Sequence, residues 1–141
     1  MSDRIFEDTF NLLCGRKLNA GIHRTVYECR LRADLVVKVE TDEDLRSFAN
    51  VRESLFWGDH EDHSAVARWL APCEYLSPDG RVLLQRRCEP LRADDLPDRL
   101  PSFLTDIKAE NFGWLDGRVV CVDYATTLTT VSTRLVKADW Y

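Results

Sequence analysis

The sequence lacks the features that mark several large classes of protein. No apolar run reaches the ~18 residues that a membrane-spanning helix needs, and residues 1–4 do not open a secretory signal peptide. Hydrophobic residues at 45% and charged residues at 30% are ordinary globular values, and the chain has no repeats and no low-complexity tract, which argues against disorder. The five cysteines are dispersed without a C-x-x-C pair, so we expect reduced thiols, a cytoplasmic setting and no membrane partner.

An excess of basic residues is also lacking. The chain has 19 Lys and Arg against 24 Asp and Glu, a formal charge of −5, which argues against a nucleic-acid-binding surface. The same charge is too small to indicate a mimic of DNA. A length of 141 residues fits one domain. A chain of this size buries about 68–70% of its unfolded surface, which is enough for a core of its own.

The most informative stretch predicts a β-hairpin around Asp116-Gly117, a pair that supplies the positive φ angles of a two-residue turn at low steric cost. The flanking runs are residues 112–115 and 118–122, and the second is apolar and β-branched, as a buried strand is. Counting outward from the turn brings Asn111 alongside Val122 and Asp123, and directly paired residues lie ~5 Å apart. We therefore expect these two side chains to converge at the open end of the hairpin.

Two further polar residues, Asp106 and Lys108, come shortly before Asn111. With Asp123 they form an ordered set of a carboxylate, a cation, an amide oxygen and a second carboxylate. Such oxygen ligands suit Mg²⁺, which completes its coordination shell with substrate phosphates, and a carboxylate beside the metal can orient a hydroxyl nucleophile. An ordinary hairpin with polar residues at its mouth is the alternative for any single residue, but the ordered set favours a functional site.

These residues carry a resemblance to a known family. The segment 106–111, Asp-Ile-Lys-Ala-Glu-Asn, resembles the catalytic loop of the protein kinase-like superfamily, and 122–125, Val-Asp-Tyr-Ala, resembles its metal-binding Asp-Phe-Gly segment. The His-Arg that usually precedes the catalytic Asp is replaced by Leu104-Thr105. The resemblance implies that Asp106 orients the acceptor hydroxyl and that Lys108 neutralises charge on the moving phosphoryl group. It further implies that the amide of residue 111 and the carboxylate of residue 123 bind Mg²⁺.

A second segment, residues 18–28, resembles the glycine-rich phosphate loop of kinases. Only Gly21 remains of three expected glycines, with Asn19 and Arg24 at the other two positions. Glycines let the backbone approach phosphates closely, so we expect the loop to bind ATP less well or differently. Arg24 could contribute a side-chain cation instead. Taken alone, this segment is more typical of a plain hairpin.

Residues 35–40, Leu-Val-Val-Lys-Val-Glu, predict a strand with Lys38 inside an apolar run. One interpretation is a lysine on an edge strand that reaches the solvent. The other follows from the resemblance, which implies that Lys38 pairs with the α- and β-phosphates of ATP. The two interpretations differ in whether the strand lies at the edge of the sheet or inside it.

A helix is expected next, from Thr41, which can cap it, to about Trp57. Its large side chains follow a 3.6-residue period along one side, through Leu45, Phe48, Val51, Arg52, Leu55 and Phe56. Glu53 lies at the edge of that stripe and can reach toward the sheet. It resembles the helix glutamate that fixes the strand lysine in kinases, with Glu43 and Glu61 as other candidates.

The remaining segments are less specific. Residues 3–14 predict a short helix that Gly15 ends, and residues 16–40 predict two or three strands. Pro78-Asp79-Gly80 between apolar runs predicts another hairpin. His60 and His63 fall in a polar loop with nearby carboxylates; a solvated surface loop is favoured there over a metal site.

The fold class that follows is α+β. The resemblance implies that residues 15–90 form a kinase-like small lobe, an antiparallel sheet plus one main helix. It further implies that residues 91–141 form a reduced remnant of the large lobe with the catalytic-loop hairpin. We expect one truncated domain over residues 1–141. A proline-bearing linker, residues 92–102, stands where kinases have two long helices, and no activation segment or Ala-Pro-Glu signal follows.

Three functional hypotheses remain open. The first is a minimal kinase-like protein that binds Mg²⁺ and ATP and transfers the terminal phosphoryl group to a protein or small-molecule hydroxyl. The second is a catalytically silent binding or inhibitory module, such as a virus or mobile element would encode. The third is an enzyme completed by a protein partner or by self-association, with Phe112 or Trp114 facing another subunit where the helical lobe is missing.

Overall fold

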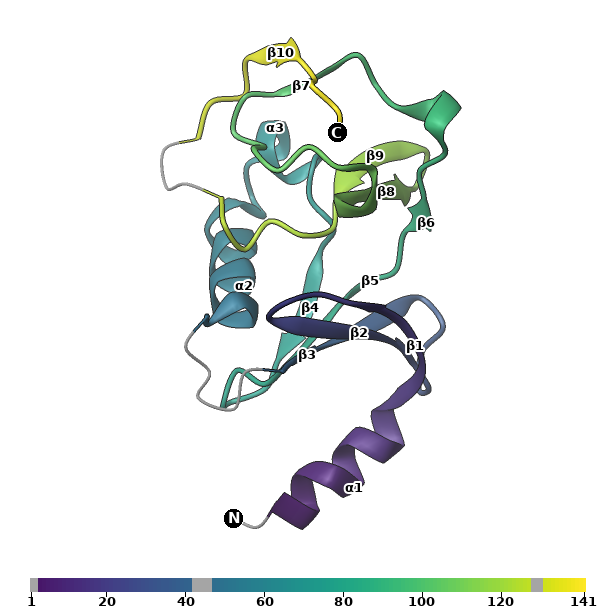
Figure 1. The fold of residues 1–141 in the computed structure, drawn as a ribbon. Coiled ribbons are helices and arrows are strands. Elements are labelled where there is room, and N and C mark those ends of the chain that lie inside the picture. The colour runs from purple at the N-terminus through teal and green to yellow at the C-terminus, as the bar shows by residue number, and fades with distance from the viewer. Residues whose placement is uncertain (1–2, 42–46, 128–130) are drawn as a thin grey trace. The chain divides into compact units, whose positions relative to one another are not determined.

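The computed structural model describes residues 3–41, 47–127 and 131–141 (Figure 1). The chain divides into two compact units, and each is described by itself below. The first contains residues 1–51 and 73–87, and the second contains residues 52–72 and 88–141. The division falls inside a helix, α2 (Ala49–His60). The lobe boundary expected near residue 90 stays a prediction.

The first unit is an antiparallel sheet of five strands preceded by a helix. The helix is α1 (Asp3–Leu13), and the strands are β1 (Cys14–Ala20), β2 (Arg24–Cys29), β3 (Leu35–Glu40), β4 (Cys73–Leu76) and β5 (Val82–Arg86). Their order in the sheet is β1-β2-β3-β5-β4, with every neighbouring pair antiparallel. With the hairpin of the second unit, this architecture confirms the α+β class and the antiparallel sheet with few helices expected of a kinase-like small lobe.

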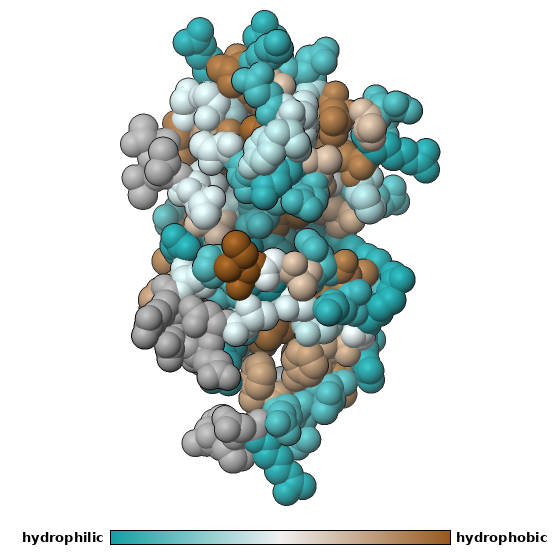
Figure 2. All heavy atoms as spheres, viewed as in Figure 1, coloured by the Kyte–Doolittle hydropathy of each residue, from teal (hydrophilic) through white to brown (hydrophobic). Residues whose placement is uncertain are grey.

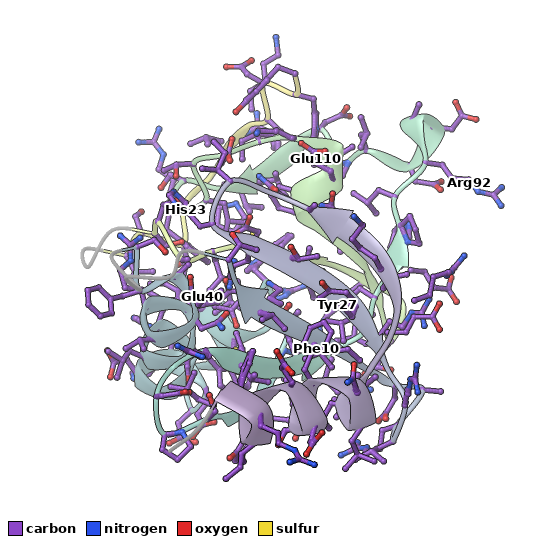
Figure 3. The ribbon with its side chains drawn as sticks, turned by 60° about the horizontal axis from the view of Figure 1, so that its bottom comes forward. Phe10, His23, Tyr27, Glu40, Arg92 and Glu110 are labelled. Carbon is purple, nitrogen blue, oxygen red and sulfur yellow. The ribbon has the colours of Figure 1, made fainter. Side chains whose placement is uncertain are left out.

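The core of the first unit forms around β3, all six residues of which are buried. Leu35, Val37 and Val39 alternate along the strand and pack in one cluster with residues of β1, β2 and β5. Helix α1 adds its apolar side to the same cluster, where the Phe10 and Tyr27 rings meet edge to face with centroids 5.1 Å apart (Figure 3). This packing explains why an amphipathic helix precedes the sheet.

The structure corrects the end of α1. The helix was expected to end at Gly15, but it ends at Leu13, and β1 begins at once with Cys14. Gly15 lies inside β1, where a Cβ atom would come within 3.3 Å of the Cβ of Glu28. This glycine therefore permits close approach of two strands rather than ending a helix.

The start and the phase of α2 also differ from the prediction. Ser47 and Phe48 are not helical, since Phe48 has a φ angle of 49°, and residues 42–46 with Glu43 lie outside the described residues. Phe48 and Leu55 are 55% and 60% exposed. The buried side instead runs through Ala49, Glu53 and Phe56. The predicted stripe was wrong because it placed Glu53 at its edge, whereas this polar residue is fully buried on the helix.

The second unit is built from short elements. They are α3 (Ser64–Ala67), β6 (Glu89–Pro90), the 3₁₀ turns η1 (Ala93–Asp95) and η2 (Ala109–Asn111), β7 (Arg99–Pro101), β8 (Phe112–Leu115), β9 (Arg118–Cys121) and β10 (Leu135–Lys137). Strands β6, β8 and β9 form one antiparallel sheet in that order, and β7 pairs with β10 in another. Ala71, Leu115 and Val120 form a buried cluster at the hairpin.

The β8–β9 hairpin has the predicted turn and register. Leu115 pairs with Arg118, and Asp116 and Gly117 have φ angles of 52° and 80°, as a type I′ turn requires. Gly113 in β8 has a separate role. A Cβ atom there would lie 2.6 Å from the Cβ of Cys88, so a glycine is needed for β6 to pair with the hairpin.

The expectation that Phe112 faces another subunit is wrong. Phe112 is only 3% exposed, and the ring of Trp140 packs against it edge to face with centroids 5.1 Å apart. Trp140 is held in place because its indole Nε1 donates a 2.8 Å hydrogen bond to the Pro97 carbonyl. The chain therefore covers this aromatic side chain by itself. Trp114 is partly buried.

The surface, the helix lengths and the cysteines bear on the remaining expectations. On the face shown in Figure 2, hydrophobic residues lie in small groups separated by hydrophilic ones. None of the helices within the described residues is both long enough and apolar enough to cross a lipid bilayer. All five cysteines are free thiols, and burial raises the pKa of Cys14 to about 11.

Candidate functional site

The loop that carries Asp106 is closed by hydrogen bonds within the second unit. The backbone N–H of Lys108 donates to the Asp106 carbonyl at 3.1 Å, and that of Asn111 donates to the Lys108 carbonyl at 3.0 Å. The side-chain Nδ2 of Asn111 also donates to the Asp106 carbonyl, at 3.0 Å. With Nδ2 engaged in this bond, the amide oxygen is the acceptor atom of the Asn111 side chain.

The same residue links the loop to the strand after the hairpin turn. The Asn111 carbonyl accepts a 2.8 Å hydrogen bond from the N–H of Val122, so the pairing of β8 with β9 continues beyond the strand ends. Asp123 follows directly and is exposed, whereas Asn111 is buried. The backbone thus brings residues 111 and 123 to one end of the hairpin, as the register predicts. Binding of one metal ion by both side chains stays a prediction.

Lys108 lies between two carboxylates. Its Nζ is 3.8 Å from Oδ2 of Asp106 and 3.8 Å from Oε1 of Glu110. Its side chain is 36% exposed, so these pairs are screened by solvent and add little stability. The two ion pairs instead position the Lys108 ammonium group beside Asp106, the carboxylate that is expected to orient a hydroxyl.

Tyr124, the residue that follows Asp123, is held in place by its own buried side chain. It is 2% exposed, and its hydroxyl donates a 2.7 Å hydrogen bond to the Ala71 carbonyl. Its ring lies 5.9 Å from that of Phe56. In the Asp-Phe-Gly-like segment, the extra hydroxyl of this tyrosine is therefore a buried anchor for the chain. Sequence reasoning named the tyrosine only as a departure from the family pattern.

Sequence reasoning missed a contact to Asp106 altogether. The Tyr141 hydroxyl donates a hydrogen bond to Oδ1 of Asp106, and the N–H of Tyr141 donates to the Ile107 carbonyl at 3.2 Å. Lys108 Nζ lies 5.8 Å from the centre of the same ring. The hydrogen bond to Asp106 raises the pKa of Tyr141 above its usual value of 10.0, with smaller contributions from burial and from the charges of Asp106 and Glu110. No local signal marks this contact, since 35 positions separate the partners.

In the first unit, Lys38 lies in the middle of the sheet. Strand β3 runs between β2 and β5, where Lys38 pairs with Val26 and Leu83. The side chain is only 4% exposed, so the alternative of a solvated lysine on an edge strand is wrong. A buried ammonium group is costly unless it is paired. This position is the one that the resemblance implies for a lysine that binds phosphates.

Gly21 and Arg24 occupy the turn between β1 and β2. The N–H of Gly21 donates a 2.8 Å hydrogen bond to the Arg24 carbonyl, which closes the turn. A Cβ atom on Gly21 would meet only that carbonyl oxygen, at an ordinary 3.6 Å. Arg24 is 8% exposed, and its Nη1 donates to Oδ1 of Asn50 at 3.2 Å. Arg24 thus has a structural partner, and its predicted contact with phosphate is not tested by this geometry.

Glu53 is completely buried on α2, in contrast to Glu61, which is exposed. A buried carboxylate is unlike a solvated helix residue, because its burial costs free energy unless partners compensate. This supports Glu53 over Glu61 as the functional candidate. Lys38 and Glu53 belong to different units of the chain, so their pairing stays a prediction.

Within the described ranges, no group of three or more His, Cys, Asp or Glu side chains is arranged to hold a metal ion. His60 ends α2, with Nδ1 2.9 Å from the Phe56 carbonyl, and its ring centroid lies 6.3 Å from that of His63. Asn111 and Asp123 supply an amide and a carboxylate oxygen. That donor set fits Mg²⁺, because this ion keeps several waters and takes further ligands from substrate phosphates.

Comparison with known proteins gives a limited result. The chain matches no family model and no curated protein. Among solved structures it is similar to an aminoglycoside phosphotransferase, APH(2″)-IIa, in a ternary complex with streptomycin and ATP. The two chains are 18% identical with a TM-score of 0.46, and the alignment covers 65% of this chain and 30% of the phosphotransferase. The chain therefore spans less than one third of the length of that enzyme.

Proposed function

We propose that this protein binds Mg²⁺ and ATP and transfers the terminal phosphoryl group to a hydroxyl. The observation that carries the proposal is the hydrogen bonding of Asn111. Its side chain closes the loop onto Asp106, and its carbonyl receives the N–H of the residue before Asp123. Two carboxylates, an amide and the Lys108 cation thereby come from one short stretch of chain.

The residues would act in distinct ways. Asn111 and Asp123 would hold the metal, and Lys38, braced by Glu53, would bind the α- and β-phosphates with the turn at Gly21 and Arg24. Bound Mg²⁺ would neutralise phosphate charge. Phosphoryl transfer depends mainly on positioning and on charge stabilisation, so it needs no other chemical group from the protein.

Asp106 and Lys108 would serve the acceptor side. The Asp106 carboxylate accepts a hydrogen bond from a hydroxyl in the structure, which is the contact that general base catalysis requires. Lys108 Nζ, 3.8 Å from the same carboxylate, would offset negative charge as it develops.

Thermal melting with Mg²⁺ and ATP tests nucleotide binding. A ligand at 100 times its Kd should add about 2.7 kcal/mol, which raises the melting temperature of a domain this size by roughly 10 °C. Asp123→Asn should abolish the shift. Asp116→Asn is the matched control, because it removes a carboxylate at the turn of the same hairpin, where Asn tolerates the positive φ angle. An unchanged melting temperature of the wild type at millimolar Mg-ATP would remove the proposal.

The second candidate is a catalytically silent kinase-fold module that binds or inhibits another protein. The replacement of His-Arg by Leu104-Thr105 favours it. Release of labelled phosphate from [γ-³²P]ATP separates the two candidates when the wild type is compared with Asp106→Ala. Turnover that is lost in the variant, with Mg-ATP binding retained, supports catalysis. Equal rates of phosphate release by the wild type and by Asp106→Ala support the silent module.

A further inference from the structure

The segment of residues 138–141 lies along the loop of Asp106 and is held there by several contacts. The N–H of Ala138 donates to the Asp98 carbonyl at 2.8 Å, Trp140 Nε1 donates to the Pro97 carbonyl at 2.8 Å, and the N–H of Tyr141 donates to the Ile107 carbonyl at 3.2 Å. The packing of Trp140 on Phe112 adds an apolar contact. The backbone of this segment is therefore placed independently of the Tyr141 side chain.

The Tyr141 side chain is exposed to solvent and is also hydrogen-bonded to Asp106, the proposed base. It is 78% exposed, yet its hydroxyl donates to Oδ1 of Asp106. Lys108 Nζ lies 3.8 Å from the other carboxylate oxygen, Oδ2 of Asp106, and 5.8 Å from the centre of the Tyr141 ring. A hydroxyl bonded to the base and open to solvent is the ground-state arrangement for attack on an incoming phosphoryl group.

We propose that Tyr141 is an intramolecular phosphoryl acceptor, so that this chain modifies its own tyrosine with the γ-phosphoryl group of a nucleoside triphosphate. The inference rests on the proposed function, because it requires Mg-ATP to bind. It goes further by naming the acceptor, a phenolic hydroxyl supplied by the same chain.

The step balances with the groups named. A lone pair of Tyr141 Oη forms a bond to the γ-phosphorus, and the bond from that phosphorus to the oxygen bridging to the β-phosphate breaks, which releases the nucleoside diphosphate. The phenolic proton passes to the Asp106 carboxylate that already accepts its hydrogen bond. A base in contact is needed, because a phenol with the usual pKa near 10 is protonated at neutral pH, and the hydrogen bond to Asp106 raises the pKa of Tyr141 further.

The other three of the chain's four tyrosines are placed differently. Tyr124 is buried, with its hydroxyl on the Ala71 carbonyl, and Tyr27 packs against Phe10. Tyr75 is 52% exposed on β4. It is therefore an accessible tyrosine of the first unit that can serve as a matched control for Tyr141.

The product limits the reaction to one turnover per chain. A phosphotyrosine carries roughly two negative charges at neutral pH. At Tyr141 these would lie beside Asp106 and near Glu110, which contributes negative charge to the same site. Repulsion should then displace the side chain from the loop. We expect incorporation to level off at one phosphate per molecule.

The test is incubation of the whole protein with Mg²⁺ and [γ-³²P]ATP, followed by mass spectrometry of the tryptic peptide that begins at Ala138. Phosphate should appear on Tyr141, with a first-order rate that does not change over a tenfold range of protein concentration. Tyr141→Phe should remove incorporation and Tyr75→Phe should leave it unchanged. Asp106→Asn should lower the rate at least a hundredfold while the Mg-ATP melting shift remains.

The outcomes separate this inference from the function on which it rests. Absence of a melting shift with Mg-ATP overturns both. A normal shift with an unmodified Tyr141 overturns only the inference. In that case, faster transfer to an added hydroxyl compound by Tyr141→Phe would identify Tyr141 as an occupant that blocks Asp106. A rate per molecule that rises with protein concentration overturns the intramolecular route.

Discussion

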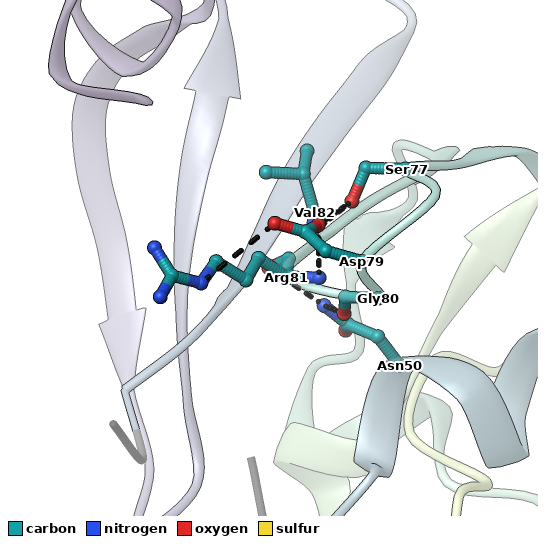
Figure 4. A network of polar contacts seen from close by, with 6 residues as sticks. All are labelled: Asn50, Ser77, Asp79, Gly80, Arg81 and Val82. Carbon is teal, nitrogen blue, oxygen red and sulfur yellow. Dashed lines mark hydrogen bonds and ion pairs between the residues drawn. The ribbon is translucent and has the colours of Figure 1, made fainter. Parts of the chain in front are cut away.

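Replacing Asn50 by alanine should strongly destabilise the first unit. Asn50 is fully buried at the start of α2. Its Oδ1 accepts a 3.2 Å hydrogen bond from Arg24 Nη1. Its Nδ2 lies 3.1 Å from the Lys38 carbonyl. It also lies 3.1 Å from the Gly80 carbonyl and 3.0 Å from the Arg81 carbonyl (Figure 4). One side chain thus connects β2, β3 and the turn between β4 and β5.

The size of the effect follows from counting hydrogens. Nδ2 carries two hydrogens, so they are shared among the three carbonyls. The Arg81 carbonyl has a further donor, the N–H of Glu40 at 2.9 Å. Two neutral bonds contribute about 1 kcal/mol each, and the bond from a guanidinium contributes about 1.5–3 kcal/mol. Asn50→Ala should therefore lower the free energy of unfolding by about 4 kcal/mol.

Urea unfolding followed by far-UV circular dichroism measures this loss. Asn11→Ala, an exposed asparagine on α1, is the matched control and should stay within ~0.5 kcal/mol of the wild type. The four tryptophans all belong to the second unit, at positions 57, 69, 114 and 140. Their fluorescence therefore reports whether both units unfold together. A loss below 1 kcal/mol for Asn50→Ala by circular dichroism would refute the reasoning.

Two further predictions concern the second unit and its loop. Gly113→Ala should lower the free energy of unfolding by about 1–3 kcal/mol, because the added methyl group overpacks the site. In the control Gly58→Ala on α2, where nothing lies within 4 Å of the added atom, the free energy of unfolding should rise by up to about 1 kcal/mol. Equal effects of the two substitutions in urea unfolding would contradict the close packing at Gly113. The raised pKa of Tyr141 means that its bond stabilises the fold fully below pH ~10 and is lost as the pH rises through the folded-state pKa. Absorbance titration at 295 nm should show a late-ionising component from Tyr141 that is lost in Asp106→Asn.

Local turn chemistry made the hairpin predictable. The Asp116-Gly117 pair fixes a two-residue turn, and a two-residue turn fixes the register of the strands that it joins. The convergence of residues 111 and 123 at the end of the hairpin needs nothing more than this count. The apolar residues around Lys38 likewise predicted the strand β3, but they left open whether it lies at the edge of the sheet or between β2 and β5, where the structure places it.

The features that were not predictable depend on distant parts of the chain. The phase of α2 is set by buried Asn50 and Glu53, and a count of apolar residues misses polar side chains whose partners lie elsewhere. Arg24 is one of those partners, 26 positions from Asn50. Tyr141 and Asp106 are likewise joined only in the folded chain, so neither segment carries a pattern that indicates the other.

The segment of residues 138–141 also covers part of the hairpin. Strand β10 pairs with β7, and this pairing leads the chain to Trp140, whose ring covers Phe112. The Phe112 side chain is thus buried with the help of a residue near position 140. The next residue is Tyr141, on Asp106. Covering the hairpin and delivering a hydroxyl to the proposed base are therefore linked, and a Trp140→Ala substitution should weaken both the stability of the second unit and phosphorylation of Tyr141.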